Sequence, residues 1–360
     1  MIDDLIPGIT QAALQGVYHV VYHLTLALTA LIQPSSWLYW PYVVSSLVLA
    51  AAALRWQAPA GERVKPHLSR AIWWHPSARA DYRLYLANAL ILPLVLTRLL
   101  PSVAAACAAL GSPACLPAET NGLTAGLHDA ASTGVTFALR ALWTLLFFIA
   151  WDLGRFLAHC LLHDCPALWP FHRLHHSAQV LTPITAFRAH PVELLVMAWG
   201  PLVTTTLATL LFNRASGQTV EPFLFLGLHV VLAATNFIDN LRHSTVWVSY
   251  GHSLGHWLIS PAHHQLHHSC EPRHLGCNRG FTLAIWDRLY GTLYVPGVRP
   301  EAFRLGLGDA SEPAWHRLRH AWFEPFRESL ALVLAWVRAP TRPPVQDATP
   351  DPGADPPRTP

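Results

Sequence analysis

The strongest constraint in this sequence is a series of apolar runs, each about long enough to cross a membrane. They lie near residues 14–33, 36–55, 83–105, 134–160, 192–212 and 222–239. About 20 apolar residues in a helix span the ~30 Å hydrocarbon core, and a helix satisfies its own backbone hydrogen bonds there. Across the chain, 52% of the residues are hydrophobic and only 12% are charged. The sequence therefore predicts an all-α protein, a polytopic membrane helical bundle.

The polar stretch between the second and third runs predicts the orientation of this bundle. Loops on the cytoplasmic side of a membrane are enriched in basic residues. The stretch carries Arg55, Arg63, Lys65, Arg70, Arg79 and Arg83. Following the runs from this loop places every dense histidine segment on the cytoplasmic side. Met1–Thr10 has two aspartates and no basic residue, so we expect the first run to stay as an anchor rather than to be a cleaved signal.

Changes in composition divide the chain into four segments. Residues 1–132 are expected to hold N-terminal transmembrane helices and loops. Residues 133–295 contain the histidine patterns and are expected to form the catalytic domain, whose histidine-rich helices make a cytosolic cap. Residues 296–338 are less apolar and should form a cytosolic or amphipathic segment. Residues 339–360 are rich in proline and cannot bury a core, which predicts a disordered tail.

Histidine is the second unusual feature, with 22 in the chain. His159 and His163 form an H-x-x-x-H pattern, and two nearly identical H-x-x-H-H-S segments follow at 172–177 and 264–269. On a helix, residues i, i+3 and i+4 lie close to one face, so the imidazoles within each box can converge. The recurrence of the second pattern predicts two similar half-sites.

The number of these histidines predicts two metal ions. The boxes hold eight imidazoles, whereas one zinc site needs three or four ligands. Imidazole alone suits Fe, Zn, Cu or Ni, so the residues leave the metal open. A zinc hydrolase of the H-E-x-x-H type would have glutamate where Cys160 stands. Asp152 lies two turns before His159 and could orient a ligand ring, or could be a polar residue facing the bundle.

The boxes resemble those of the fatty acid hydroxylase and sterol desaturase superfamily over roughly residues 140–295. Three further segments are similar to that family's motifs. Arg188-Ala-His190-Pro191-Val-Glu193 resembles its R-x-H-P-x-E element, Trp286–Thr292 resembles its W-D-R-x-F-G-T end, and His243-Ser244 resembles its H-S-N. Thr245 and Arg279 depart from the pattern, so we expect a different pocket near the third box.

The resemblance implies a set of metal ligands and of residues that support them. The implied ligands are His159, His163, His172, His175, His176, His243, His264, His267 and His268. His190 is either a tenth ligand or a residue that caps the next helix. The implied supporting residues are Asp152, Arg188, Glu193, Asn278 and Asp287. His252 with His256 stays open as a further ligand pair, and His263 is interpreted as a neighbour of the site.

By this resemblance, the chain is expected to be a di-iron membrane oxidoreductase that uses O₂ to hydroxylate or desaturate a lipid C–H bond. It shows no dinucleotide, haem-attachment or iron–sulfur motif, so electrons should come from a separate reductase, ferredoxin-type protein or b-type cytochrome. No basic stripe indicates nucleic-acid binding. The composition favours a bacterial inner-membrane protein. Two alternatives remain: a metal-dependent lipid hydrolase or isomerase on the same scaffold, and a non-enzymatic metal-binding membrane sensor or transporter.

Overall fold

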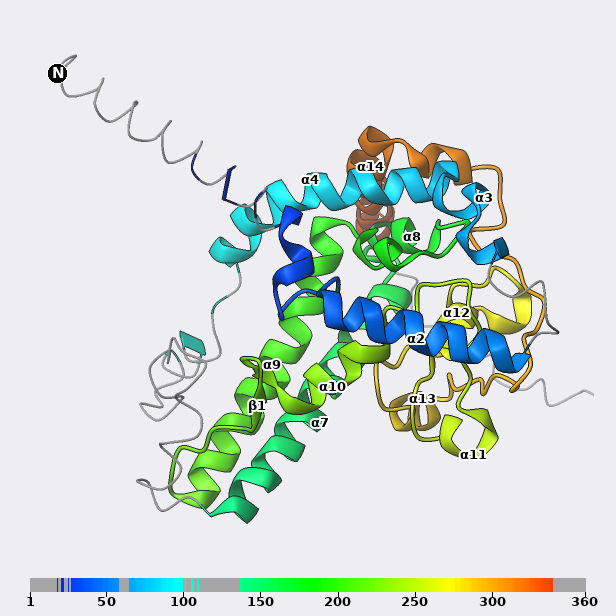
Figure 1. Cartoon of the computed structure of the whole chain (residues 1–360). Helices are drawn as coiled ribbons and strands as arrows, with labels where there is room; N and C mark the ends of the chain where they lie inside the picture. The colour runs from blue at the N-terminus through cyan, green and yellow to red at the C-terminus, as the bar shows by residue number, and fades with distance from the viewer. Residues whose placement is uncertain are drawn as a thin grey trace, which may run out of the picture.

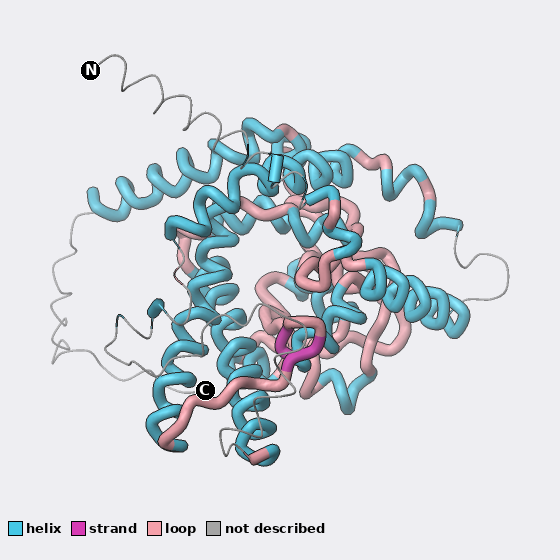
Figure 2. The backbone as a smooth tube through the Cα atoms, turned by 60° about the vertical axis from the view of Figure 1, so that its left-hand side comes forward, coloured by secondary structure: helices cyan, strands magenta, loops and turns pink. Residues whose placement is uncertain are grey.

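The computed structural model describes residues 27–57, 65–99 and 136–338, with a few isolated residues between 18 and 25 and between 101 and 109. The predicted tail at 339–360 and part of the predicted helix at 14–33 lie outside the described residues. In the described part, the chain is almost entirely helix and loop, with one pair of two-residue strands (Figure 2). The predicted helical fold class is confirmed.

Two long helices, α7 (Phe137–Asp164) and α9 (Pro191–Ser216), lie side by side and extend away from a group of shorter helices (Figure 1). Glycines at their contact allow the close approach. A Cβ atom on Gly154 would lie 2.5 Å from the Cα atom of Pro201, nearer than side chains come. Small residues of this kind are common where membrane helices pack closely.

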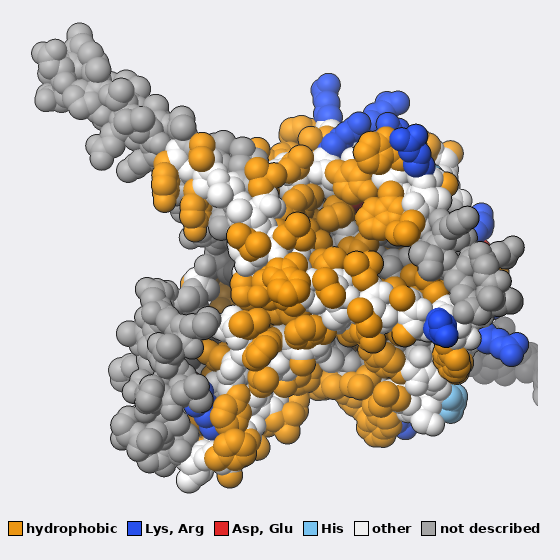
Figure 3. All heavy atoms as spheres, viewed as in Figure 1, with side chains coloured by type: hydrophobic (Ala, Val, Ile, Leu, Met, Phe, Trp, Pro, Cys, Tyr) orange, Lys and Arg blue, Asp and Glu red, His pale blue; other side chains and the backbone are white. Residues whose placement is uncertain are grey.

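Among the described residues, α7 and α9 are the two helices that are long and apolar enough to cross a membrane. Their apolar surface is only partly covered by protein. On α9, Val203 and Leu207 are each 56% exposed and Leu211 is 61% exposed. Figure 3 shows a broad face of hydrophobic side chains with Lys and Arg gathered along its margins. Exposed apolar area of this extent suggests association with a membrane.

The predicted crossing at 222–239 is wrong. This segment starts with a hairpin of β1 (Leu224–Phe225) and β2 (Leu228–His229), and only α10 (Val230–Asp239) is helical. Ten residues of helix reach only about 15 Å. Helices α2 (Trp40–Gln57) and α4 (Pro76–Leu99) lie in two other predicted runs, but neither combines the length and hydropathy of a span. The polytopic bundle stays a prediction.

The histidine segments lie on short helices at one end of α7 and α9. In chain order these elements are α8 (Trp169–His176), η4 (Pro183–Phe187), α11 (Gly251–Gly255), α12 (Pro261–His267), η5 (Pro272–His274) and α13 (Ile285–Tyr290). Before them come η1 (Ala30–Ile32), η2 (Lys65–Leu68) and α3 (Arg70–Trp73), and after them η6 (Glu312–His316) and α14 (Leu318–Arg338). Figure 1 shows α14 and α4 on the side of α8, and α11 and α13 beside α12.

Each of the two H-x-x-H-H helices is held by its own apolar cluster. Leu174 of α8 packs with Leu84, Trp315 and Ala321, whereas Leu266 of α12 packs with residues that include Trp247. The two leucines occupy the same position in the repeated segment, and both have no exposed surface. Burying a leucine side chain contributes roughly 1.5–3 kcal/mol. The repeated segment therefore includes the leucine that packs its helix into the core as well as the histidines.

Candidate metal centre

Nine histidines form two adjoining groups (group one and group two). Group one contains His159, His163, His172, His176 and His267, and group two contains His175, His243, His264 and His268. Within each group, one nitrogen atom from every ring lies within 4.8 Å of those of the others. The groups touch, because the His176 and His268 rings stack with their centroids 4.8 Å apart. All nine histidines that the sequence singles out are brought together, while their binding of metal stays a prediction.

Each of the two repeated H-x-x-H-H-S segments contributes histidines to both groups. The first segment places His172 and His176 in group one and His175 in group two. The second places His264 and His268 in group two and His267 in group one. Residues i and i+4 lie one above the other on a helix, whereas i+3 projects to the other side of that line. The half-sites are similar, as predicted, but each segment serves both.

The local sequence explains why each box helix starts where it does. Both α8 and α12 have proline in their first turn, where the missing N–H has no cost. Ser260 caps α12 together with His263, whose Nδ1 lies 2.7 Å from the serine hydroxyl. His263 also contacts the Gly255 carbonyl oxygen through Nε2 at 3.1 Å, and it lies outside both groups. It is a structural neighbour of the boxes, as interpreted from the sequence.

The second nitrogen of several rings is held by an acceptor outside the groups. His159 donates from Nδ1 to the Arg279 carbonyl oxygen at 2.7 Å, and His267 donates to that of Cys277 at 2.7 Å. His175 donates to the Arg188 carbonyl oxygen at 3.1 Å. A carbonyl oxygen only accepts hydrogen bonds, so in the neutral rings the hydrogen is on Nδ1. The Nε2 atoms that face the group centres therefore carry lone pairs.

This arrangement fits a cation at the centre of each group. Burial lowers the pKa of His267 to about 3 and that of His175 to about 4, so both rings are neutral near pH 7. The Nε2 atoms of His267 and His159 are 3.1 Å apart although neither carries a hydrogen in this tautomer. Converging lone pairs repel one another unless a positive ion lies between them. Neutral imidazoles with the other N–H held by oxygen are the usual form of histidine in metal sites.

Polar residues beyond the rings hold several of them in place. Glu193 accepts from Nδ1 of His172 at 2.9 Å and from the backbone N–H of His190 at 3.2 Å. Asp287 accepts from the backbone N–H groups of Arg279 and Gly280, both at 2.7 Å. Because the Arg279 carbonyl receives the His159 hydrogen bond, Asp287 fixes that ring indirectly.

Arg188 and Asn278 support the site through the backbone. The carbonyl of Arg188 accepts from His175, and its side chain is fully buried. The side chain of Asn278 bridges two segments, donating to the carbonyl oxygens of His263 and Tyr294 at 3.1 and 2.9 Å. Asn278 has a φ of 52°, a left-handed conformation that asparagine tolerates better than most residues.

Asp152 and His190 both make their hydrogen bonds outside the two groups. Asp152 orients no histidine: it accepts from the backbone N–H groups of Thr282 and Leu283 and from the indole of Trp286. It thus connects α7 to α13 and to the residues just before that helix. His190 lies outside both groups, because its Nδ1 accepts from Val192 N–H at the start of α9 and its Nε2 donates to the Trp322 carbonyl. This is the geometry of the capping alternative, and ligation of a metal by His190 stays a prediction.

The pair His252 and His256 also lies apart from the two groups. Their rings are 4.4 Å apart, and His256 donates from Nδ1 to the His252 carbonyl oxygen on α11 and its C-terminal end. Neither residue belongs to a candidate metal-binding group within the described part of the chain. The open possibility of a further ligand pair is therefore not supported.

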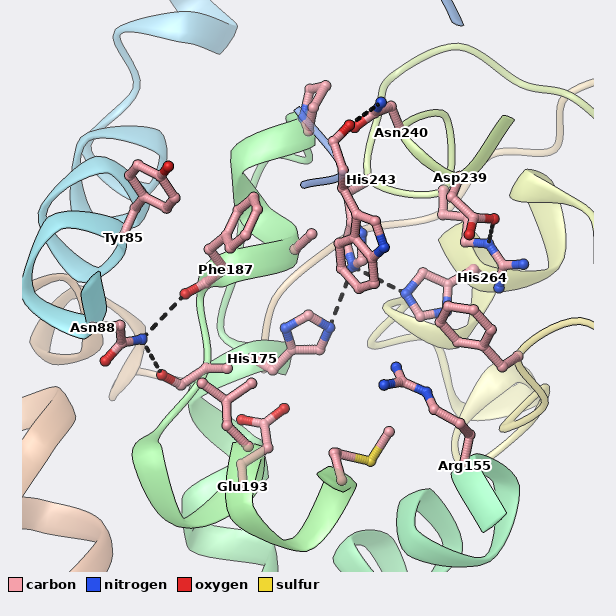
Figure 4. Close-up of a pocket in the computed structure, with 18 of the residues that line it drawn as sticks. Tyr85, Asn88, Arg155, His175, Phe187, Glu193, Asp239, Asn240, His243 and His264 are labelled. Atoms are coloured by element: carbon pink, nitrogen blue, oxygen red, sulfur yellow. Dashed lines mark hydrogen bonds and ion pairs between the residues drawn. The ribbon is translucent and has the colours of Figure 1, made fainter. Parts of the chain in front are cut away.

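A cavity of about 510 Å³ opens onto both groups. Figure 4 shows its side with His175, His243 and His264. His159 and His172 of group one line it, and so do His175, His243 and His264 of group two. The rest of the wall is mainly apolar and includes Trp37, Phe187, Leu194, Met197 and Phe281. A volume of this size is typical of small-molecule sites. A ligand in this cavity would lie beside both histidine groups.

Sequence reasoning missed residues of this wall that come from the N-terminal part of the chain. Tyr85 and Asn88 of α4 line the cavity, and Asn88 donates to the Ala189 carbonyl oxygen at 2.8 Å. Asp81 of the same helix forms a buried ion pair with Arg188 at 2.8 Å. A lone aspartate within a basic stretch was the one available signal. Helix α4 therefore belongs to the site.

Comparison with known proteins identifies the same part of the chain that carries the histidine groups. Residues 144–292 match the fatty acid hydroxylase family. The ornithine lipid hydroxylase OlsE of Rhizobium tropici is 33% identical over 43% of this chain and 43% of its own length. The alkylglycerol monooxygenase of Xenopus tropicalis is 26% identical over 54% of this chain and 38% of its own. The human cholesterol 25-hydroxylase is 27% identical over 52% and 59%.

Each of these relatives is matched over less than two thirds of its own length. No solved structure matches the chain. The matched segment contains all nine histidines of the two groups. Residues 144–292 of this chain are therefore similar in sequence to the fatty acid hydroxylase family and to lipid and sterol hydroxylases and monooxygenases.

Proposed function

We propose that this protein is an O₂-dependent di-iron membrane oxidoreductase that hydroxylates, or desaturates, a C–H bond of a lipid. One observation carries the proposal: two groups of imidazoles turn their Nε2 atoms toward one another and border a single, mainly apolar cavity. The three named relatives, which are a lipid hydroxylase, a monooxygenase and a sterol hydroxylase, support the reaction class.

The two groups would each hold one iron ion. Group one offers five imidazoles and group two offers four. When bound, the iron pair supplies the activation of O₂ that attack on an unactivated C–H bond requires. The protein's own residues set the geometry: Glu193 and the carbonyls of Arg279, Cys277 and Arg188 hold four rings by their Nδ1 atoms. Such outer contacts typically account for 10–100-fold in metal affinity or activity.

The cavity wall would position the lipid and exclude water. Trp37 stacks near Phe281, with ring centroids 6.3 Å apart, and both line the cavity beside the histidines. A dry wall keeps a reactive site from side reactions with solvent. The exposed apolar surface of α7 and α9 would place the cavity at a bilayer boundary, where a lipid can enter directly. We propose a bacterial inner-membrane location with the histidines facing the cytoplasm, and a separate electron-donor protein.

The proposal predicts a defined change in cellular lipids. Total lipids from cells with and without the gene should differ by species shifted by +16 mass units for hydroxylation or by −2 for desaturation. Growth under ¹⁸O₂ should move the +16 product to +18. A lipid change that needs neither oxygen nor reductant would favour a hydrolase or isomerase on this scaffold. Metal flux in proteoliposomes with no lipid change would favour a transporter.

A further inference from the structure

Arg155 brings a positive charge into the apolar cavity. It lies on α7 four residues before His159, and its guanidinium points into the same space as His175, His243 and His264 (Figure 4). Its guanidinium carbon lies 4.3 Å from the ring centroid of Phe281 and 5.4 Å from that of Trp151. These rings hold the guanidinium by its flat face and leave its edge free to donate hydrogen bonds.

Arg155 has no hydrogen bond or ion pair with any residue in the described part of the chain, and its Nε is buried. The carboxylates of the cavity are engaged elsewhere. Glu193 accepts from His172 and from the backbone of His190. Asp239 accepts from Nε of Arg242 at 2.8 Å.

Arg242 adds a second guanidinium that lies against the same aromatic ring. Its guanidinium carbon lies 4.4 Å from the Phe281 centroid, so Phe281 is stacked against both arginines. Nη1 of Arg242 is buried without a partner among the described residues, as is Oδ2 of Asp239. A buried guanidinium that makes no hydrogen bond is costly, because it has lost its water, and the carboxylates of Asp152, Asp239 and Glu193 act on Arg155 only through space.

We infer that the cavity binds a lipid through an anionic oxygen group, a carboxylate or a phosphate, held by the edge of Arg155. That the ligand is a lipid rests on the proposed function. That the cavity binds an anion is inferred from the surroundings of Arg155 and does not depend on the proposed function. Arginine recognises both groups with two parallel hydrogen bonds, which lysine cannot form.

The position of Arg155 also limits which carbon is attacked. Arg155 and His159 lie one turn apart on α7 and line the same cavity, so an anion held by the guanidinium would lie in the space that the histidines border. A group held there keeps the carbons next to it beside the histidines. The oxidised carbon should therefore lie within a few bonds of the anionic group rather than at the far end of an acyl chain.

Binding of twelve-carbon probes to the purified full chain in non-ionic detergent tests the anion site without iron, oxygen or turnover. Dodecanoate or dodecyl phosphate should bind at least about tenfold more tightly than dodecanol, since hydrogen bonds to charged groups typically contribute enough for a tenfold to hundredfold change. Arg155→Met keeps the apolar stem and should abolish this preference, whereas Arg155→Lys should retain part of it.

Arg140→Met is the matched control, because Arg140 is on the same helix and lies 4.7 Å from the centroid of Phe223 but does not line the cavity. It should bind the probes as the unaltered chain does. Equal binding of all three probes, or an unchanged preference in Arg155→Met, would overturn the inference. Inorganic phosphate that binds as tightly as dodecyl phosphate would assign the site to free phosphate instead. Because no reaction is needed, these outcomes are independent of whether a lipid is oxidised.

Tandem mass spectrometry of any +16 product tests the position of attack. The fragment that carries the anionic group should also carry the added oxygen. Oxygen on the distal half of an acyl chain would contradict the placement by Arg155, and would leave the oxidoreductase proposal intact.

Discussion

His267→Ala is expected to remove bound metal and activity together. His267 is the one member of group one that comes from α12, and its Nε2 lies 3.1 Å from that of His159 and 3.3 Å from that of His163. Without it, the ligands from α7 and α8 lose the ring that joins them to the second box. Loss of a residue that only hydrogen-bonds to a metal ligand typically lowers metal affinity or activity by about 10–100-fold. We therefore expect loss of a ligand itself to reduce product by more than about 100-fold.

The measurement is metal content and lipid product for the same preparation. His252→Ala is the matched control, because His252 is exposed on α11 and belongs to neither group. It should keep both metal and product. Thermal denaturation of both variants in detergent separates loss of a ligand from loss of the fold. Full metal content and full activity in His267→Ala would remove the basis for group one as a metal site.

Asp81→Ala is expected to destabilise the protein by about 3–5 kcal/mol, because it leaves the guanidinium of Arg188 buried without its counter-ion. Both side chains are completely buried, and their ion pair is 2.8 Å long. Asp81 also accepts from the hydroxyl of Thr185 at 2.7 Å. Arg188 in turn donates to the Leu174 carbonyl oxygen of α8 at 2.9 Å. Loss of the pair should therefore loosen the first H-x-x-H-H helix.

Denaturation in detergent, followed by circular dichroism, measures this effect. Asp81→Asn can still accept from Thr185 but loses the charge, so its stability should be intermediate. Glu271→Ala breaks the exposed pair with Arg304 and should cause no measurable change, because water screens such pairs. If Asp81→Ala were as stable as Glu271→Ala, the ion pair would not anchor α8.

The histidine groups could largely be predicted from the sequence because helix geometry is local. Spacings of three and four residues predict which imidazole rings share a helix face, and the recurrence of the H-x-x-H-H-S segment predicts two such helices. The exchange of His175 and His267 between the groups could not be predicted, because it depends on how α8 and α12 face each other. That relation is set by buried residues such as Leu174 and Leu266, whose packing partners are far away in the sequence.

The roles of the surrounding polar residues were harder to predict for the same reason. Asp152 lies on the same face of α7 as His159, yet its partners come from 282–286. Arg155 lies one helical turn before His159, but its role could be inferred only from Phe281, which stacks on it from a distant loop. Hydropathy failed at 222–239 because an apolar run of that length does not reveal that its first residues form a hairpin on α7.

Metal analysis of the purified full chain, combined with oxygen uptake in the presence of a reductant, tests the central claim most directly. We expect close to two iron ions per chain, one for each histidine group, and oxygen uptake that depends on lipid and on reductant. Stoichiometric zinc with no oxygen uptake would contradict the account.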